Sequence, residues 1–139
     1  MAENQGPLFV QRIIWGALAF SQLIYLGLGL SGAIGPEAPS PEYIEDGTPT
    51  ILFAIGLGQI AFGVFGIPQV IKVPEGATLA QTQTQRIIQW ALIEAGVVLG
   101  LVCVVSGGPS TVLIGLYVVA LVGMLKLFPK DISPSTSVE

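Results

Sequence analysis

One carboxylate stands inside an apolar stretch that is long enough to cross a membrane. Glu94 lies within residues 85–105, where the only other charged side chain is Arg86 near the start. A charged side chain near the middle of a membrane-spanning helix costs at least about 2.5–3.5 kcal/mol, so such a residue usually has a binding partner or a function. Glu94 is therefore the first functional candidate.

Three further polar side chains lie deep in other apolar stretches: Ser21 and Gln22 in the first, and Gln59 in the second. Counted from the flanking basic residues at about 1.5 Å per residue, Gln22, Gln59 and Glu94 lie roughly 15, 20 and 12 Å deep, close enough for long side chains to converge. A hydroxyl, amide oxygens and a carboxylate suit a hard monovalent cation, or a network that holds a protonated carboxyl group. The alternative is that these residues only hydrogen-bond neighbouring helices, at about 0.6–2 kcal/mol per contact.

The elements that would position these residues are apolar helices. Hydrophobic residues make up 52% of the 139 residues and charged residues only 10%, and the mean hydropathy is +0.78. This composition indicates an all-α integral membrane protein, with residues 1–139 forming a single membrane domain. We predict four transmembrane helices at about residues 12–34, 50–71, 86–106 and 110–128, because each stretch can cross roughly 30 Å of hydrocarbon.

The charges predict an orientation. The basic residues all flank the predicted helices on one side: Arg12, Lys72, Arg86, Lys126 and Lys130. The connection 35–49 carries four acidic residues, several prolines and no basic residue, and we expect it to be an extended, solvated outer loop. By the positive-inside rule, both termini are cytoplasmic. We expect a multi-pass protein of the bacterial inner (plasma) membrane.

A weak internal repeat predicts the topology. Gln11–Ile14 recurs as Gln85–Ile88, and a second constant offset matches Thr50 with Thr111 and Pro68 with Pro129. The four helices are therefore expected to form two tandem helical hairpins of the same orientation, as a duplicated sequence would.

Two further patterns concern how the helices pack. Small residues in the second span allow close approach to a neighbouring helix, at Gly56, Gly58, Gly63 and Gly66. Trp15 and Trp90 occupy similar positions near the basic side and are predicted to anchor the helices at the membrane interface.

The segment Ala91–Gly96 followed by Leu99–Val102 resembles the carboxylate-bearing helix of the rotor-ring proteolipids, the c- and K-type subunits of F- and V-type ATPases. The glycine-rich span that contains Gln59 resembles their preceding hairpin helix. In sodium-type V rings, a glutamate, two glutamines, a hydroxyl and a backbone carbonyl hold the ion. The resemblance assigns these roles to Glu94, Gln59, Gln22, Ser21 and the carbonyl of Leu18. Leu18, Ser21 and Gln22 follow i, i+3, i+4 spacing on the first span, which puts them on one helix face.

The resemblance covers roughly residues 12–105 and departs from the family pattern in its order. The span 12–34 resembles a carboxylate helix in which Phe20 stands where the acid would be. In the family, the carboxylate-bearing helix is the second helix of a hairpin, so this chain begins with the equivalent of a second helix. Residues 110–128 would then take the place of the missing first helix, as in a permuted sequence. The second span lacks the full alternating glycine run, and the turn after it lacks the usual Arg-Gln-Pro motif.

The resemblance implies a membrane subunit that carries H⁺ or Na⁺ on Glu94 within an oligomeric ring or ion-driven complex. Its partners would be the lipid bilayer, copies of itself or related membrane subunits, and an arginine-bearing stator subunit. Glu94, Gln59 and Gln22 would ligate Na⁺ in a sodium-type protein, and we expect no other cofactor, no nucleic-acid partner and no catalytic activity of its own. Two alternatives stay open: a non-transporting scaffold or assembly subunit in which Glu94 and the glutamines set helix register, and a small proton-coupled transporter.

Overall fold

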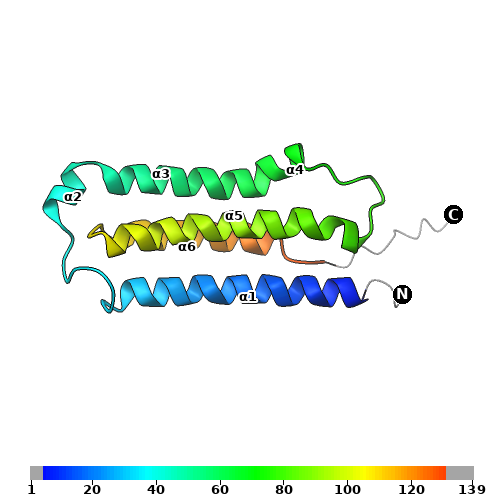
Figure 1. Cartoon of the computed structure of the whole chain (residues 1–139), viewed down its shortest axis with the longest axis horizontal. Helices are drawn as coiled ribbons and strands as arrows, with labels where there is room; N and C mark the ends of the chain where they lie inside the picture. Colours follow the sequence, from blue (N-terminus) through cyan, green and yellow to red (C-terminus); the bar gives the residue numbers. More distant parts are fainter. Residues whose placement is uncertain (1–4, 131–139) are drawn as a thin grey trace.

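The structure, a computed structural model, describes residues 5–130, which form helices and no strand (Figure 1). The long helical segments are α1 (Gln5–Leu30), Thr48–Val70, α5 (Leu79–Val105) and α6 (Ser110–Lys126). The first three are long and apolar enough to cross a membrane, and α6 is a shorter apolar helix of 17 residues. The predicted all-α class with membrane-length helices is confirmed. The two chain ends, residues 1–4 and 131–139, lie outside the described residues, so the predicted location of the termini is not addressed.

Local sequence signals set the helix ends. Thr78 and Gln81 form a capping box, in which the Gln81 N–H donates to Thr78 Oγ1 at 3.3 Å and the Thr78 N–H donates to Gln81 Oε1 at 2.9 Å. As a result α5 begins well before the predicted start at residue 86. The helix α1 begins at Gln5 rather than at residue 12 and ends at Leu30 rather than at residue 34, where Gly32 adopts a φ of 69° that ends the helix.

The acidic connection is partly helical, so the expectation of an extended loop over residues 35–49 was wrong. Pro41 is the first residue of a short helix, α2 (Pro41–Glu45), and Pro49 lies in the first turn of α3 (Thr48–Ala61). Proline fits there because the N–H groups of the first turn have no partner inside the helix. The acidic residues of this connection, Glu37, Glu42, Glu45 and Asp46, are all exposed.

A π-helical turn, η2 (Phe62–Gly66), joins α3 to α4 (Ile67–Val70). Pro68 follows it, has no N–H, and cannot make the α-helical hydrogen bond to the carbonyl of Val64. Gln89 of α5 supplies a donor instead: its Nε2 donates to the carbonyls of Gly63 at 3.0 Å and Val64 at 3.4 Å. A buried glutamine of one helix thus satisfies the irregular turn of another.

The helix α5 contacts all three other long helices, and α6 contacts α1, α3 and α5. In Figure 1, α1 and α3 lie on opposite sides of the α5–α6 pair. The first two long helices, expected to form a hairpin, are therefore separated by α5 and α6. The connection between them, residues 31–47, is long enough to pass around that pair.

Equivalent helices of the internal repeat lie side by side and run in the same direction. In the α1–α5 pair, Ser21 lies beside Glu94, and Gly29 lies near the side chain of Leu101. In the α3–α6 pair, Phe53 lies near Gly115 and Val64 near Gly123. The described part of the chain is thus two staggered layers, α1 beside α5 and α6 beside α3, that run in opposite directions (Figure 1).

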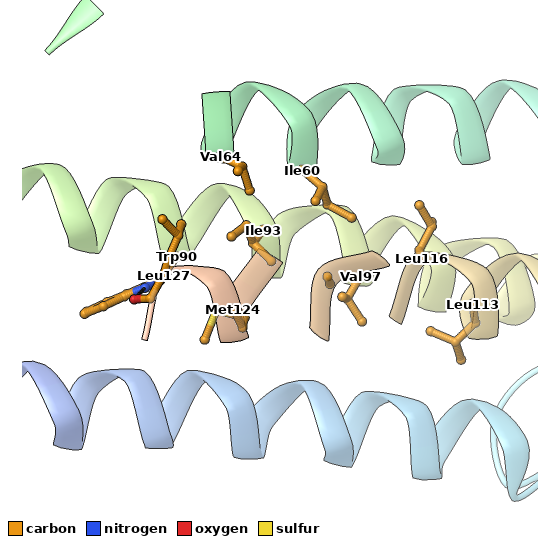
Figure 2. Packing of buried hydrophobic residues seen from close by; sticks show 10 residues of the cluster. Ile60, Val64, Trp90, Ile93, Val97, Leu113, Leu116, Met124 and Leu127 are labelled. Atoms are coloured by element: carbon orange, nitrogen blue, oxygen red, sulfur yellow. Dashed lines mark hydrogen bonds between the residues drawn. The ribbon is translucent and has the colours of Figure 1, made fainter. Parts of the chain in front are cut away.

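The core lies between α3, α5 and α6, and some of its side chains reach α1 (Figure 2). It is built from aliphatic side chains, one methionine and one tryptophan: Ile60, Val64, Trp90, Ile93, Val97, Leu113, Leu116, Ala120, Met124 and Leu127. Trp90 is 0% exposed and its Nε1 donates to the carbonyl of Leu127 at 3.3 Å, so its prediction as an interface anchor was wrong. Trp15 is half-buried and donates to the carbonyl of Met124 at 2.8 Å.

Two of the four predicted small residues mediate close helix contact. A Cβ at Gly56 would lie 3.2 Å from the Gly96 carbonyl oxygen, and a Cβ at Gly63 would lie 3.0 Å from the Gln89 carbonyl oxygen. Gly58 has no heavy atom within 4 Å of its Cβ position, and the three heavy atoms nearest the Cβ position of Gly66 all belong to the side chain of Phe62, its neighbour on the same segment. Close approach of α3 and α5 thus depends on Gly56 and Gly63, because a larger residue there would push the backbones apart.

The outer surface and the two ends differ in chemistry. Large apolar side chains cover the outward faces of the long helices, among them Phe9, Ile13, Phe20, Ile55, Phe62, Phe65, Val118, Val122 and Leu125. Such a surface is typical of helices that face lipid. The acidic residues of the first connection lie at one end of the bundle. The basic residues gather at the other end, where the guanidinium carbon of Arg12 lies 5.8 Å from the centre of the Phe128 ring. At the same end, Gln85 Nε2 of α5 donates to the carbonyl of Ile71 at 2.6 Å.

Candidate ion-binding site

Glu94 lies on the side of α5 that faces α1 and is half-buried. Its Oε1 contacts the Oγ of Ser21, and the Oη of Tyr25 donates to the same oxygen at 3.3 Å. Ser21 and Tyr25 are one helical turn apart on α1 and therefore share a face. Two hydroxyl groups from one helix thus converge on one carboxylate oxygen of its parallel neighbour.

The Ser21 hydroxyl has a second partner, the carbonyl oxygen of Leu18, at 2.8 Å. A hydroxyl carries one proton, so Ser21 donates either to Leu18 or to Glu94. When Glu94 is protonated, the carboxyl group can donate to Ser21 while Ser21 donates to Leu18. When Glu94 is ionised, Ser21 can turn its proton towards the carboxylate. The same three groups therefore provide hydrogen bonds for both protonation states.

The hydroxyl groups are not accompanied by a cationic side chain. The nearest basic residue along α5 is Arg86, about 12 Å of helix rise away at the basic end of the bundle. Within residues 5–130, no three His, Cys, Asp or Glu side chains are close enough to form a metal-binding group. The oxygen groups at this site are instead one carboxylate, two hydroxyls and one carbonyl, a set that suits a proton or a hard monovalent cation.

Gln22 lies at the depth of Glu94 but faces another direction. It follows Ser21 directly and so points about 100° further around α1. The side chain is 1% exposed, and its Nε2 has no hydrogen-bond partner among the described residues. The structure contains no hydrogen bond between Gln22 and Glu94, so the amide is buried beside the site with an unused donor.

Gln59 also lies level with Glu94, on α3. Gly63 faces Gln89 and Leu92 of α5, and Gly56 faces Gly96, so the part of α3 between the two glycines lies opposite the turn that carries Glu94. The Oε1 of Gln59 is buried and has no partner in the described part of the chain. No hydrogen bond joins it to Glu94. The structure thus brings Leu18, Ser21 and Glu94 together, and it leaves both glutamines at the same depth with one unpaired polar atom each.

Sequence reasoning missed two polar residues with clear contacts. Tyr25 is not among the predicted site residues, although its i+4 spacing from Ser21 predicts that it shares the face towards Glu94. Gln89 is 1% exposed, and the sequence signal that could have marked it is a polar side chain within the same apolar stretch as Glu94. Its hydrogen bonds to the π-helical turn show a structural role that depends on the path of α3.

Comparisons of the chain with protein-family models, with curated protein sequences and with solved structures found no match in any of the three.

Proposed function

We propose that this protein is a proteolipid-like membrane subunit that binds and carries H⁺ or Na⁺ on Glu94, within an oligomeric ring or ion-driven complex. The observation that carries the proposal is the convergence of Ser21 and Tyr25 on the Glu94 carboxylate, with the Leu18 carbonyl behind Ser21. An ionised carboxylate at this depth of a membrane is costly without a partner, so a bound proton or cation would stabilise it.

The unpaired amide of Gln22 fits the same proposal. Gln22 carries a buried amide beside Ser21, and a rotation that turns its oxygen towards the site would add one ligand for Na⁺ to the carboxylate, the two hydroxyls and the Leu18 carbonyl. Gln59 lies on α3, which α5 and α6 separate from α1, so a side-chain rotation does not by itself bring its oxygen to Glu94, and its role as a ligand stays a prediction. Without the rotation of Gln22, the Ser21–Glu94 pair by itself is the simpler arrangement for H⁺.

The layered packing fits assembly with further copies. Each of the two layers, α1 with α5 and α6 with α3, contains helices whose outward sides are exposed. A second copy could place its α1 against the free side of α5 and α3, which would repeat the contact that α5 makes with α1. The contact of α6 with α1 also fits the permuted order, because α6 then takes the place of the missing first helix. Cytoplasmic termini and a bacterial inner membrane stay predictions of this proposal.

In the proposed mechanism, Glu94 alternates between two states. In the first, a bound proton or cation neutralises the carboxyl group, and Ser21 and Tyr25 hold it against α1. In the second, the ion has left, and the carboxylate needs a positive partner, which we propose is an arginine of another subunit. Glu94 lies next to the exposed Ala91 on α5, so a partner can approach from that side without displacing a large side chain.

The experiment that tests the proposal is carbodiimide modification of the full-length protein in detergent, followed by mass spectrometry of the labelled residue. We expect Glu94 to be modified, and a bound Na⁺ to slow the reaction roughly tenfold at about ten times its dissociation constant. Labelling that does not respond to sodium at any pH, but does fall as the pH rises, would assign the site to protons.

Two variants serve as controls for the labelling experiment. Glu94→Gln should remove the label, whereas Glu42→Gln, at an exposed position of α2, should leave the rate unchanged. Ser21→Ala should weaken the sodium protection without removing the label. If Glu94 is not modified in the folded protein, or if its modification ignores both sodium and pH, the proposal fails.

One observation favours the scaffold function as a second candidate. The hydrogen bonds from Ser21 and Tyr25 to Glu94 set the register of α1 against α5, which is the role that a purely structural glutamate would have. A scaffold predicts that Glu94→Gln, which keeps the hydrogen bonds, preserves assembly and function fully. An ion carrier predicts that the same variant assembles normally and loses all ion coupling.

A further inference from the structure

The basic end of the bundle contains a cavity of about 250 Å³ with an unusual lining. Three cationic side chains line it: Arg86 from α5, Lys126 from the end of α6, and Lys130. The other polar side chains that line it are uncharged, and within residues 5–130 no carboxylate lines the cavity. Arg86 is half-buried, so its charge is partly removed from water. This cavity has the charge and donors to bind a phosphate group.

A second feature adjoins this cavity on the outer surface. A groove of about 280 Å³ lies between α3 and α6, and its walls are apolar apart from Lys126. Phe65 and Val122 are among the lining residues and are exposed, at 62% and 63%. Lys126 lines both the groove and the basic cavity, and its Nζ lies 4.5 Å from the centre of the Phe65 ring. The apolar groove therefore begins at a residue of the cationic site.

The two features together match the chemistry of an amphipathic anion. An inorganic phosphate would use the three cations and leave the apolar groove empty. A neutral hydrophobic molecule would use the groove and leave the cations unpaired. A phospholipid of net negative charge fits both, because its head group lies at the membrane surface beside basic residues while its chains run along the helices towards the membrane centre.

We propose that the basic cavity and the groove together bind one anionic phospholipid, with its phosphate against Arg86, Lys126 and Lys130 and one acyl chain between α3 and α6. This site is separate from Glu94 and does not depend on the proposed ion carrier. Its consequence is that the lipid holds the end of α6 against the π-helical turn of α3, where Phe65 and Lys126 meet.

The test is native mass spectrometry of the detergent-solubilised full chain, titrated with phosphatidylglycerol, phosphatidylcholine or inorganic phosphate. We expect phosphatidylglycerol to bind at least roughly tenfold more tightly than phosphatidylcholine, since each basic residue near the head group contributes roughly a fivefold change in affinity. Lys126→Gln should lower the affinity roughly fivefold. Lys126→Arg should retain it, and Lys72→Gln, which removes a charge that lines neither feature, should have no effect.

The groove is tested with a matched pair on α6. Val122→Trp should fill the groove and lower phosphatidylglycerol binding, whereas Val118→Trp, at an exposed position that does not line the groove, should leave it unchanged. If inorganic phosphate competes as well as the lipid and Val122→Trp has no effect, the site binds free phosphate and the lipid proposal is wrong. Equal binding of the two phospholipids would also overturn it.

Discussion

On the side of α5 that faces α3, Gly96 meets Gly56 and Ile60, while on the side that faces α1, Glu94 meets Ser21 and Tyr25. The α3 side is closely packed, because a Cβ at Gly96 would lie only 2.6 Å from Ile60 Cγ1 and 2.9 Å from the Gly56 carbonyl oxygen. The α1 side uses longer side chains and hydroxyl groups.

This difference indicates a division of roles on one helix. Close backbone approach at α3 supplies dispersion energy and leaves no room for an ion, so it holds the bundle together. The α1 side keeps a titratable group within reach of donors that can reorient. Substitutions on the α3 side should therefore change stability, and substitutions on the α1 side should change ion binding with little loss of stability.

The largest expected effect comes from Gly96→Val. The added side chain must displace Ile60 and the Gly56 backbone, and overpacking of this kind costs about 1–3 kcal/mol. The free energy of unfolding can be measured by titrating the mild-detergent protein with dodecyl sulfate and following the fluorescence of the buried Trp90. Gly58→Val is the matched control, because no heavy atom lies within 4 Å of its Cβ position. Equal stability of the two variants would contradict the close α3–α5 contact.

The next effect concerns the buried donor at the π-helical turn. Gln89→Leu should lower the free energy of unfolding by about 1 kcal/mol, because it leaves the carbonyls of Gly63 and Val64 without that donor. In a Pro68→Ala background, the loss of unfolding free energy caused by Gln89→Leu should be smaller, because the N–H of residue 68 can then donate to the carbonyl of Val64. A double-mutant cycle measured by the same unfolding assay tests this coupling. Independent, additive effects of the two substitutions would show that Gln89 does not compensate for Pro68.

The smallest effect on stability is expected on the α1 side. Tyr25→Phe removes one hydroxyl donor at 3.3 Å from Glu94 and should cost about 0.6 kcal/mol. The same variant should alter the rate at which carbodiimide modifies Glu94, because one of its two hydroxyl partners is gone. Tyr117→Phe on α6, where the hydroxyl has no hydrogen bond to the described residues, is the control. A change in stability without any change in labelling would favour the scaffold function over the ion carrier.

Much of the fold was predictable from residue patterns. Apolar stretches of membrane length predicted the long helices, and the separation of basic from acidic residues predicted two chemically distinct ends. The helix ends were less predictable. The capping box at Thr78 and Gln81 extends α5 beyond its apolar part, and prolines begin helices within the acidic connection. A hydropathy pattern does not detect the capping box or the prolines at helix starts, because both act on the hydrogen bonds of the first helical turn.

The candidate site was predictable in its depth and its carboxylate, and less so in its neighbours. Counting residues placed Gln22, Gln59 and Glu94 at similar depths, since helix rise is nearly constant. Which side chain reaches the carboxylate depends on rotation about each helix axis, and one position changes that by about 100°. Ser21 and Tyr25 therefore contact Glu94. Gln22, which directly follows Ser21, is buried and makes no hydrogen bond to Glu94.

The sequence by itself determined that this is a helical chain of membrane character with one carboxylate deep in its third long helix, because composition and helix length suffice for that conclusion. Only the tertiary structure decided that α5 lies between α1 and α3, that Tyr25 joins Ser21 at Glu94, and that Lys126 belongs to both a cationic cavity and an apolar groove. These features depend on which helix faces pack together, and that choice follows from the close fit of glycines against bulky neighbours across the whole bundle rather than from any one segment.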